Sequence, residues 1–192
     1  MKKIEFICCW AILLLLVPSA LAHEVKYRTF MNGPNENPAV PSPGTGTALV
    51  TFDLDLITMH VQASFSDLVG TTTASHIHCC ANPPTNVGVA TTTPSFPGFP
   101  LGVTAGVMDT TFDMTLVSSY NAPFITANGG TVDGAFNALL NGIAAGRAYF
   151  NVHTVFRPGG EIRGHLFLVP EPSSVMLAMI GLAGLFVRRR RK

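Results

Sequence analysis

Residues 146–166 read GRAYFNVHTVFRPGGEIRGHL, and this stretch indicates the fold class. Apolar and polar side chains alternate over residues 147–155, as they do in a β-strand with one buried face. A second strand is predicted over residues 161–169, and Gly159 and Gly160 between the two are typical of a turn. The stretch therefore predicts two neighbouring antiparallel strands.

The same alternation recurs along the chain. Apolar residues at three- and four-residue steps predict one short helix over residues 132–145, and Pro- and Gly-rich loops are expected over 32–46 and 82–102. Many short strands with one helix predict a mainly β fold, an antiparallel Greek-key β-sandwich or barrel. The further strands are predicted over residues 25–31, 47–55, 59–65, 72–79 and 107–116.

Composition narrows the class of protein. The chain has 192 residues, of which 47% are hydrophobic and 12% are charged. These values exclude a disordered polar chain and a coiled coil. Residues 23–169 carry five basic and nine acidic side chains, a net charge of −4. Nucleic-acid binding is not expected, because such a body has no basic surface to neutralise phosphates.

The N-terminal residues 1–22 read MKKIEFICCWAILLLLVPSALA and have the three parts of a secretory signal. Two lysines precede an apolar run over residues 6–17, and small residues precede the expected cut after Ala22. We predict a signal peptide that signal peptidase removes. The alternative is an uncleaved membrane anchor, but an apolar run of twelve residues is short against the ~20 that a bilayer span needs.

The C-terminal residues also have three parts. Pro170, Glu171 and Pro172 come first, an apolar stretch follows over residues 175–187, and a basic cluster ends the chain at 188–192. The basic cluster is expected to stay cytoplasmic, so the tail predicts a transient membrane helix. With the N-terminal segment, this gives a hydrophobic helix at each end of the chain.

This three-part order resembles a PEP-CTERM sorting signal. The resemblance implies that an exosortase-type membrane protease cuts near the Pro-Glu-Pro motif, and that the mature protein reaches the cell surface or the extracellular matrix. Exopolysaccharide or other surface proteins are then the expected partners. The domain organisation we predict is a signal peptide over 1–22, a folded domain over 23–169 and a sorting tail over 170–192.

Three histidines are candidate metal ligands. His76 and His78 are two residues apart in a predicted strand, so their imidazoles share one face, and His153 lies on the polar face of the 147–155 strand. If these strands are neighbours, the three imidazoles meet and suit one copper or zinc ion. The alternative is that they are exposed polar residues or hydrogen-bonded structural histidines.

The last predicted strand places Glu161, Arg163 and His165 on one face. These residues are candidates for the polar groups that surround the histidine site. The simpler alternative is an ion pair between Arg163 and Glu161 or another carboxylate on that face.

Cys79 and Cys80 are the only cysteines of the predicted folded domain. Export favours oxidation, so a vicinal disulfide is one prediction. Free thiols, an intermolecular bridge and sulfur ligands beside the histidines remain as alternatives, because adjacent Cα atoms across a trans peptide lie about 3.8 Å apart, closer than in most disulfides.

Three stretches together resemble the CHRD domain: NENPAVPSPGTGTALVTFD at 35–53, ASHIHCC at 74–80 and the opening stretch at 146–166. That module is repeated in chordin and found singly in bacterial secreted proteins. The resemblance implies an extracellular β-sandwich of no established enzymatic activity. We therefore expect a structural or binding role in the cell envelope or exopolysaccharide matrix rather than catalysis. Self-association through an edge strand is an alternative.

The three histidines are also similar to copper ligands of copper-zinc superoxide dismutase, which is another Greek-key sandwich. This likeness implies a superoxide-dismutase-like fold and, as an alternative function, a copper- or zinc-binding redox protein. No histidine lies between residues 79 and 146, where the bridging ligand would fall, so dismutase activity is not expected.

Overall fold

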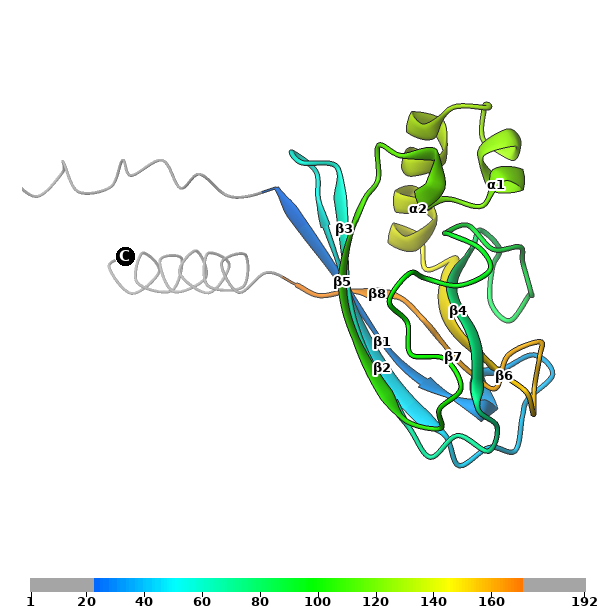
Figure 1. Cartoon of the computed structure of the whole chain (residues 1–192). Helices are drawn as coiled ribbons and strands as arrows, with labels where there is room; N and C mark the ends of the chain where they lie inside the picture. Colours follow the sequence, from blue (N-terminus) through cyan, green and yellow to red (C-terminus); the bar gives the residue numbers. More distant parts are fainter. Residues whose placement is uncertain (1–22, 171–192) are drawn as a thin grey trace, which may run out of the picture.

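The strands form one antiparallel sheet that curves into a half-barrel. A computed structural model describes residues 23–170 of the chain. The strand order is β4-β6-β7-β1-β2-β3-β5, and β8 pairs with β1. Figure 1 shows β1, β2, β3 and β5 as a curved wall that faces β4 and β6. The strands are β1 (Glu24–Asn32), β2 (Thr45–Asp53), β3 (Thr58–Ser66), β4 (Thr72–Cys79), β5 (Gly106–Asp113), β6 (Ala148–Thr154), β7 (Ile162–His165) and β8 (Phe167–Leu168).

The prediction of a mainly β, antiparallel fold is confirmed, but the prediction of a sandwich is not. The described residues form a single sheet, and the Greek-key arrangement of superoxide dismutase is not confirmed. The loop between β4 and β5 lies where a sandwich would have its second sheet. The ring of Phe96 in this loop packs between two rings of the sheet, 5.2 Å from Phe112 of β5 and 5.8 Å from Phe150 of β6 between centroids. This aromatic contact closes the open side of the half-barrel.

Two helices lie together at one end of the half-barrel (Figure 1). The longer helix, α2 (Val132–Ala144), agrees closely with the predicted helix and begins at Thr131, whose side chain accepts a hydrogen bond from the Gly134 amide. The shorter helix, α1 (Ala122–Ala127), was not predicted, because six residues are too few to establish a helical period. Two short 3₁₀ turns are η1 (Gly33–Asn35) and η2 (Val117–Ser119).

The last predicted strand is two strands. β7 lies between β6 and β1, whereas β8 pairs with the first half of β1 through Tyr27 and Arg28. The Val169 amide then donates to the Lys26 carbonyl over 2.8 Å. The two ends of the described chain therefore lie side by side, as Figure 1 shows.

Both predicted terminal helices, over 1–22 and within 170–192, fall outside the described residues. Within residues 23–170, no helix has the length and apolar character needed to cross a membrane.

Candidate metal centre

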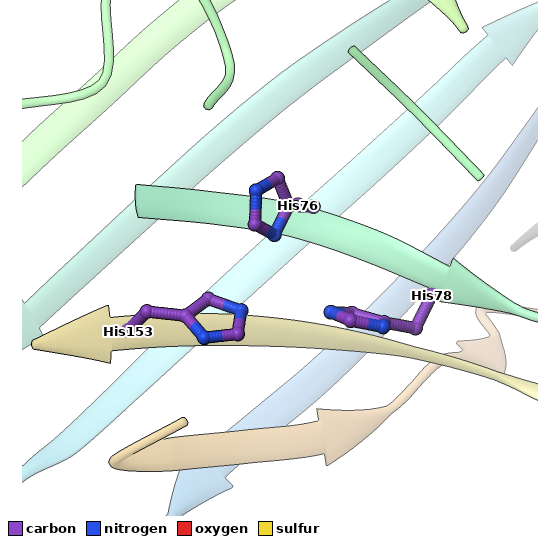
Figure 2. Close-up of side chains that lie close together, drawn as sticks. All are labelled: His76, His78 and His153. Atoms are coloured by element: carbon purple, nitrogen blue, oxygen red, sulfur yellow. The ribbon is translucent and has the colours of Figure 1, made fainter. Parts of the chain in front are cut away.

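His76 and His78 of β4 and His153 of β6 lie together on one side of the sheet (Figure 2). β4 and β6 are neighbours, and their register pairs Ala74 with His153 and His76 with Asn151. One ring nitrogen from each of the three histidines lies within 4.8 Å of the other two. We call these three residues the three-histidine cluster.

The cluster is buried. The alternative prediction that the three histidines are exposed polar residues is therefore wrong. The members of the cluster are 6%, 8% and 9% exposed. Every residue of β6 is buried, on both faces of the strand. The polar face is covered by loops, since residues 82–100 and 155–161 contribute backbone atoms that contact the histidine rings. The sheet therefore has a buried polar face in addition to its apolar core.

Each imidazole of the cluster hydrogen-bonds to one backbone carbonyl. A carbonyl oxygen only accepts, so the bonded nitrogen must carry a proton, and in the neutral ring the other nitrogen then keeps its lone pair. Those other nitrogens are His76 Nδ1, His78 Nε2 and His153 Nε2, and all three are buried without a partner. The bonds run from His76 Nε2 to Pro94 (2.6 Å), His78 Nδ1 to Val87 (2.7 Å) and His153 Nδ1 to Pro158 (2.8 Å).

This pattern is that of metal-binding histidines. A ligating imidazole donates its second N–H to a carbonyl or carboxylate, which fixes the tautomer and the ring orientation. A buried nitrogen without a partner otherwise costs free energy. Three such nitrogens converge here, so the arrangement fits one ion that prefers imidazole ligands, such as copper or zinc.

The histidines of the cluster are neutral. Burial lowers the pKa of His76 and of His78 to about 4, and it also lowers the pKa of His153. The hydrogen bond from each ring to a carbonyl acts in the opposite direction, but its effect on the pKa is smaller. The charge on a neighbouring protonated histidine would lower the pKa of His76 and of His78 further. Each ring therefore offers a free lone pair near neutral pH.

Acidification is expected to destabilise the metal-free protein. The pKa of each clustered histidine is lower in the folded chain than its usual value, so the unfolded chain binds more protons. The free energy of unfolding should therefore fall as the pH drops from about 6.5 towards 4. Urea titrations across this range measure the slope. The variant His76→Leu/His78→Leu should show a clearly smaller slope, and equal slopes in both proteins would contradict the assignment.

Tyr149 and Arg163 extend the buried polar face beyond the cluster. The ring of Tyr149 stacks on His78, with centroids 4.8 Å apart and planes 6° apart. The Arg163 guanidinium carbon lies 4.6 Å from the centroid of the Tyr149 ring. A cation, an aromatic ring and a candidate ligand thus form one stack.

Glu161, Arg163 and His165, which were predicted to surround the histidine site together, have different surroundings in the structure. Arg163 lies at the tyrosine, and its carboxylate neighbour is Glu36, 3.7 Å from Nε, not Glu161. His165 packs edge-on against Tyr149, with centroids 5.5 Å apart. Glu161 comes before β7, next to Gly160 with its φ of 125°, and its carboxylate bonds to groups at the end of the sheet instead.

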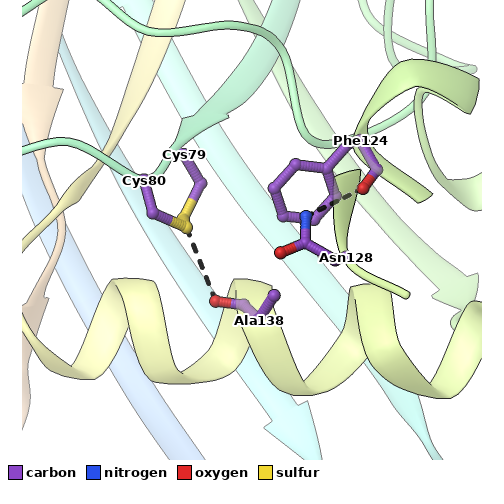
Figure 3. Close-up of a disulfide and its surroundings, with 5 residues drawn as sticks. All are labelled: Cys79, Cys80, Phe124, Asn128 and Ala138. Atoms are coloured by element: carbon purple, nitrogen blue, oxygen red, sulfur yellow. Dashed lines mark hydrogen bonds between the residues drawn. A yellow bond between two sulfur atoms is a disulfide. The ribbon is translucent and has the colours of Figure 1, made fainter. Parts of the chain in front are cut away.

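The sulfur atoms of Cys79 and Cys80 are joined in a vicinal disulfide, and the peptide between the two residues is cis (Figure 3). The disulfide packs on α2, where Cys80 Sγ lies 3.5 Å from the Ala138 carbonyl oxygen. The arrangement is the predicted vicinal disulfide. Its sulfurs lie against the helix and are not part of the three-histidine cluster.

Sequence reasoning missed the groups that orient the rings. The carbonyls of Val87, Pro94 and Pro158 belong to irregular loops, and a backbone carbonyl leaves no mark in a sequence. Glu36 and Tyr149 were also missed as neighbours of the site. The alternation of β6 does place Tyr149 and His153 on one face, so that signal was present.

Comparison with protein families covers nearly all of the described domain. The model of the CHRD domain matches residues 27–166, well over half of the chain. The chain belongs to the CHRD domain family. All three clustered histidines lie inside the matched residues of the CHRD domain. Searches of curated proteins and of solved structures found no match.

A second family model, the PEP-CTERM protein-sorting motif, matches residues 168–192 after the CHRD domain. The motif implies recognition by exosortase-type processing and an exported, surface-directed protein. The resemblances to the CHRD domain and to the sorting signal are thereby confirmed.

Proposed function

We propose that the mature protein is a metal-binding module of the cell surface, in which the three-histidine cluster holds one copper or zinc ion. The observation that carries this proposal is the convergence of three buried, unpartnered ring nitrogens within 4.8 Å. Copper and zinc are both well matched by imidazole nitrogen. The role that follows is binding, in the cell envelope or its exopolysaccharide matrix.

The geometry needs only a small adjustment to hold such an ion. Metal–nitrogen bonds of about 2.0–2.1 Å place tetrahedral ligand atoms roughly 3.3 Å apart. The ring nitrogens lie within 4.8 Å of one another. Each ring therefore has to move by about 1 Å or less, and the loops that bond to the rings can follow.

The domain organisation belongs to the same proposal. Removal of residues 1–22 and of a tail that begins near Pro170 leaves residues 23–169, which include every strand and helix described above. The match to the sorting motif supports the C-terminal boundary. The export signal is compatible with metal uptake outside the cytoplasm, where the vicinal cysteines can also be oxidised.

The experiment is a metal analysis of the mature protein recovered, without a polyhistidine tag, after export of the full-length chain. Elemental mass spectrometry is expected to find about one copper or zinc ion per chain, and His76→Ala/His78→Ala is expected to lose it. His60→Ala is the matched control, because His60 lies on β3 and pairs with Asp109 over 2.6 Å outside the cluster. Near-UV circular dichroism verifies that each variant is folded.

Two results would contradict the proposal. One is a folded wild-type protein that holds neither ion after loading with copper and with zinc. The other is a metal content that the double substitution leaves unchanged.

A further inference from the structure

The ligand atoms of the three-histidine cluster are electrically neutral. Among the described residues, the cluster consists of histidine alone, with no carboxylate or cysteine in it. Burial disfavours the protonated form of each ring, and the hydrogen bond to a carbonyl fixes which nitrogen of the neutral ring carries the N–H. A bound ion would therefore keep its full charge in a site that is at most 9% exposed at each ligand.

A fixed cation stands one aromatic ring away from this site. The Arg163 side chain is 1% exposed and lies over Tyr149, which in turn stacks on His78. The guanidinium carbon lies 4.6 Å from the centroid of the Tyr149 ring, and that centroid lies 4.8 Å from the centroid of His78, so the charge stands within about 10 Å of a ligand ring in a buried site. The donors of Arg163 bond to neutral oxygens: Nε to the Asn35 carbonyl (2.6 Å), Nη1 to Asn86 Oδ1 (2.6 Å) and Nη2 to the Pro84 carbonyl (3.0 Å).

One carboxylate partly offsets that charge. Glu36 Oε2 lies 3.7 Å from Arg163 Nε. Burial raises the pKa of Glu36 to about 7, against the opposing effects of Arg163 and Asn151. The carboxylate is therefore a weak counter-charge near neutral pH, and the surroundings of the cluster stay net positive.

The charge of the ion decides which metal fits this environment. The cost of moving an ion out of water grows with the square of its charge, and repulsion from a fixed cation grows in proportion to the charge. Both effects oppose a divalent ion more than a monovalent one. Zinc with three protein ligands also takes a fourth ligand, and copper(II) prefers tetragonal sites. Copper(I), with a filled d shell, accepts three neutral nitrogen donors.

We propose that the three-histidine cluster selects copper(I) over zinc(II) and copper(II), with Arg163 acting through Tyr149 and His78 as the positioning charge that sets the preference. This inference rests on the proposed function, since it names the ion that the cluster holds.

The test is an anaerobic competition at pH 7, where Glu36 is only partly ionised, with the mature wild-type protein. A chromogenic copper(I) chelator with ascorbate as reductant measures the copper(I) affinity, and chelators of known affinity measure those for zinc(II) and copper(II). Copper(I) is expected to bind tightest. Glu36→Gln removes the counter-charge at similar shape, so the ratio of copper(I) to zinc(II) affinity should rise by about tenfold. Arg163→Met should lower that ratio by a similar factor.

The outcomes separate this inference from the proposed function. Tighter binding of zinc(II) or copper(II) than of copper(I), or a ratio that Glu36→Gln leaves unchanged, overturns the selectivity but leaves the metal site standing. Failure of all three ions to bind overturns the proposed function. If Arg163→Met does not fold, the wild-type ranking and Glu36→Gln decide the question.

Discussion

Replacement of Glu161 by alanine is expected to lower the free energy of unfolding by about 3–5 kcal/mol, or to prevent folding. Glu161 is fully buried, and its carboxylate joins segments that are far apart in the sequence. Burial alone would raise its pKa, but hydrogen bonds to the carboxylate outweigh burial and hold the pKa below the usual value. The bonds come from Ser42 Oγ (2.6 Å), the Val69 amide (2.6 Å), the Gly70 amide (3.1 Å) and Thr154 Oγ1 (2.6 Å).

Loss of the carboxylate would leave several buried donors without an acceptor, and that is the source of the large cost. Glu161→Gln keeps one oxygen but turns an N–H₂ group towards a donor. Its free energy of unfolding should therefore lie between those of Glu161→Ala and the wild type. Asp109→Ala is the control, because Asp109 is an exposed carboxylate, and its effect should stay within about 0.5 kcal/mol. Urea unfolding at pH 7 measures all three. A Glu161→Ala protein as stable as Asp109→Ala would refute the expectation.

Gly142→Ala is expected to destabilise the domain by about 3 kcal/mol, although alanine is the better helix former by roughly 1 kcal/mol. Gly142 is a buried residue of α2 at the vicinal disulfide. A Cβ atom at this position would collide with the sulfurs of both Cys79 and Cys80. The linked sulfurs cannot rotate apart, so the helix would have to move away from β4.

Asn141→Ala provides the matched control one residue earlier in the same helix. Its side chain is exposed, so the substitution should leave stability unchanged or raise it slightly. Thermal unfolding of both variants beside the wild type makes the comparison. If Gly142→Ala melts at or above the temperature of Asn141→Ala, the helix does not rest on the disulfide as described.

Alternation in the sequence was sufficient to predict the strands and one face of the site. His76 and His78 share a face because they are two residues apart in β4, and His153 lies on the polar face of β6 for the same reason. The pairing of β4 with β6 has no local signal, since about 70 residues separate them. That pairing was stated only as a condition, and the structure supplies it.

Other features could not be predicted because they depend on long-range packing. Residues 147–155 read as a half-buried strand, but loops cover the polar face and make β6 fully buried. Phe96 packs against β5 and β6 where a second sheet was expected. It belongs to a Pro-rich loop without a periodic pattern of apolar residues, so its burial could not be predicted. Arg163 and Glu36 form an ion pair although they are far apart in the sequence. Glu161 is only two residues from Arg163 and is expected on the same face of a strand, so the sequence suggested Glu161 as the partner instead.

The pairing of β8 with the start of β1 determines where the two ends of the described domain lie. The segments that precede His23 and follow Pro170 leave from neighbouring points on one pole of the domain. The opposite pole carries the loops over residues 33–40 and 155–161 (Figure 1). An attachment at either end of the domain would therefore be made at the same pole and would leave the opposite pole uncovered.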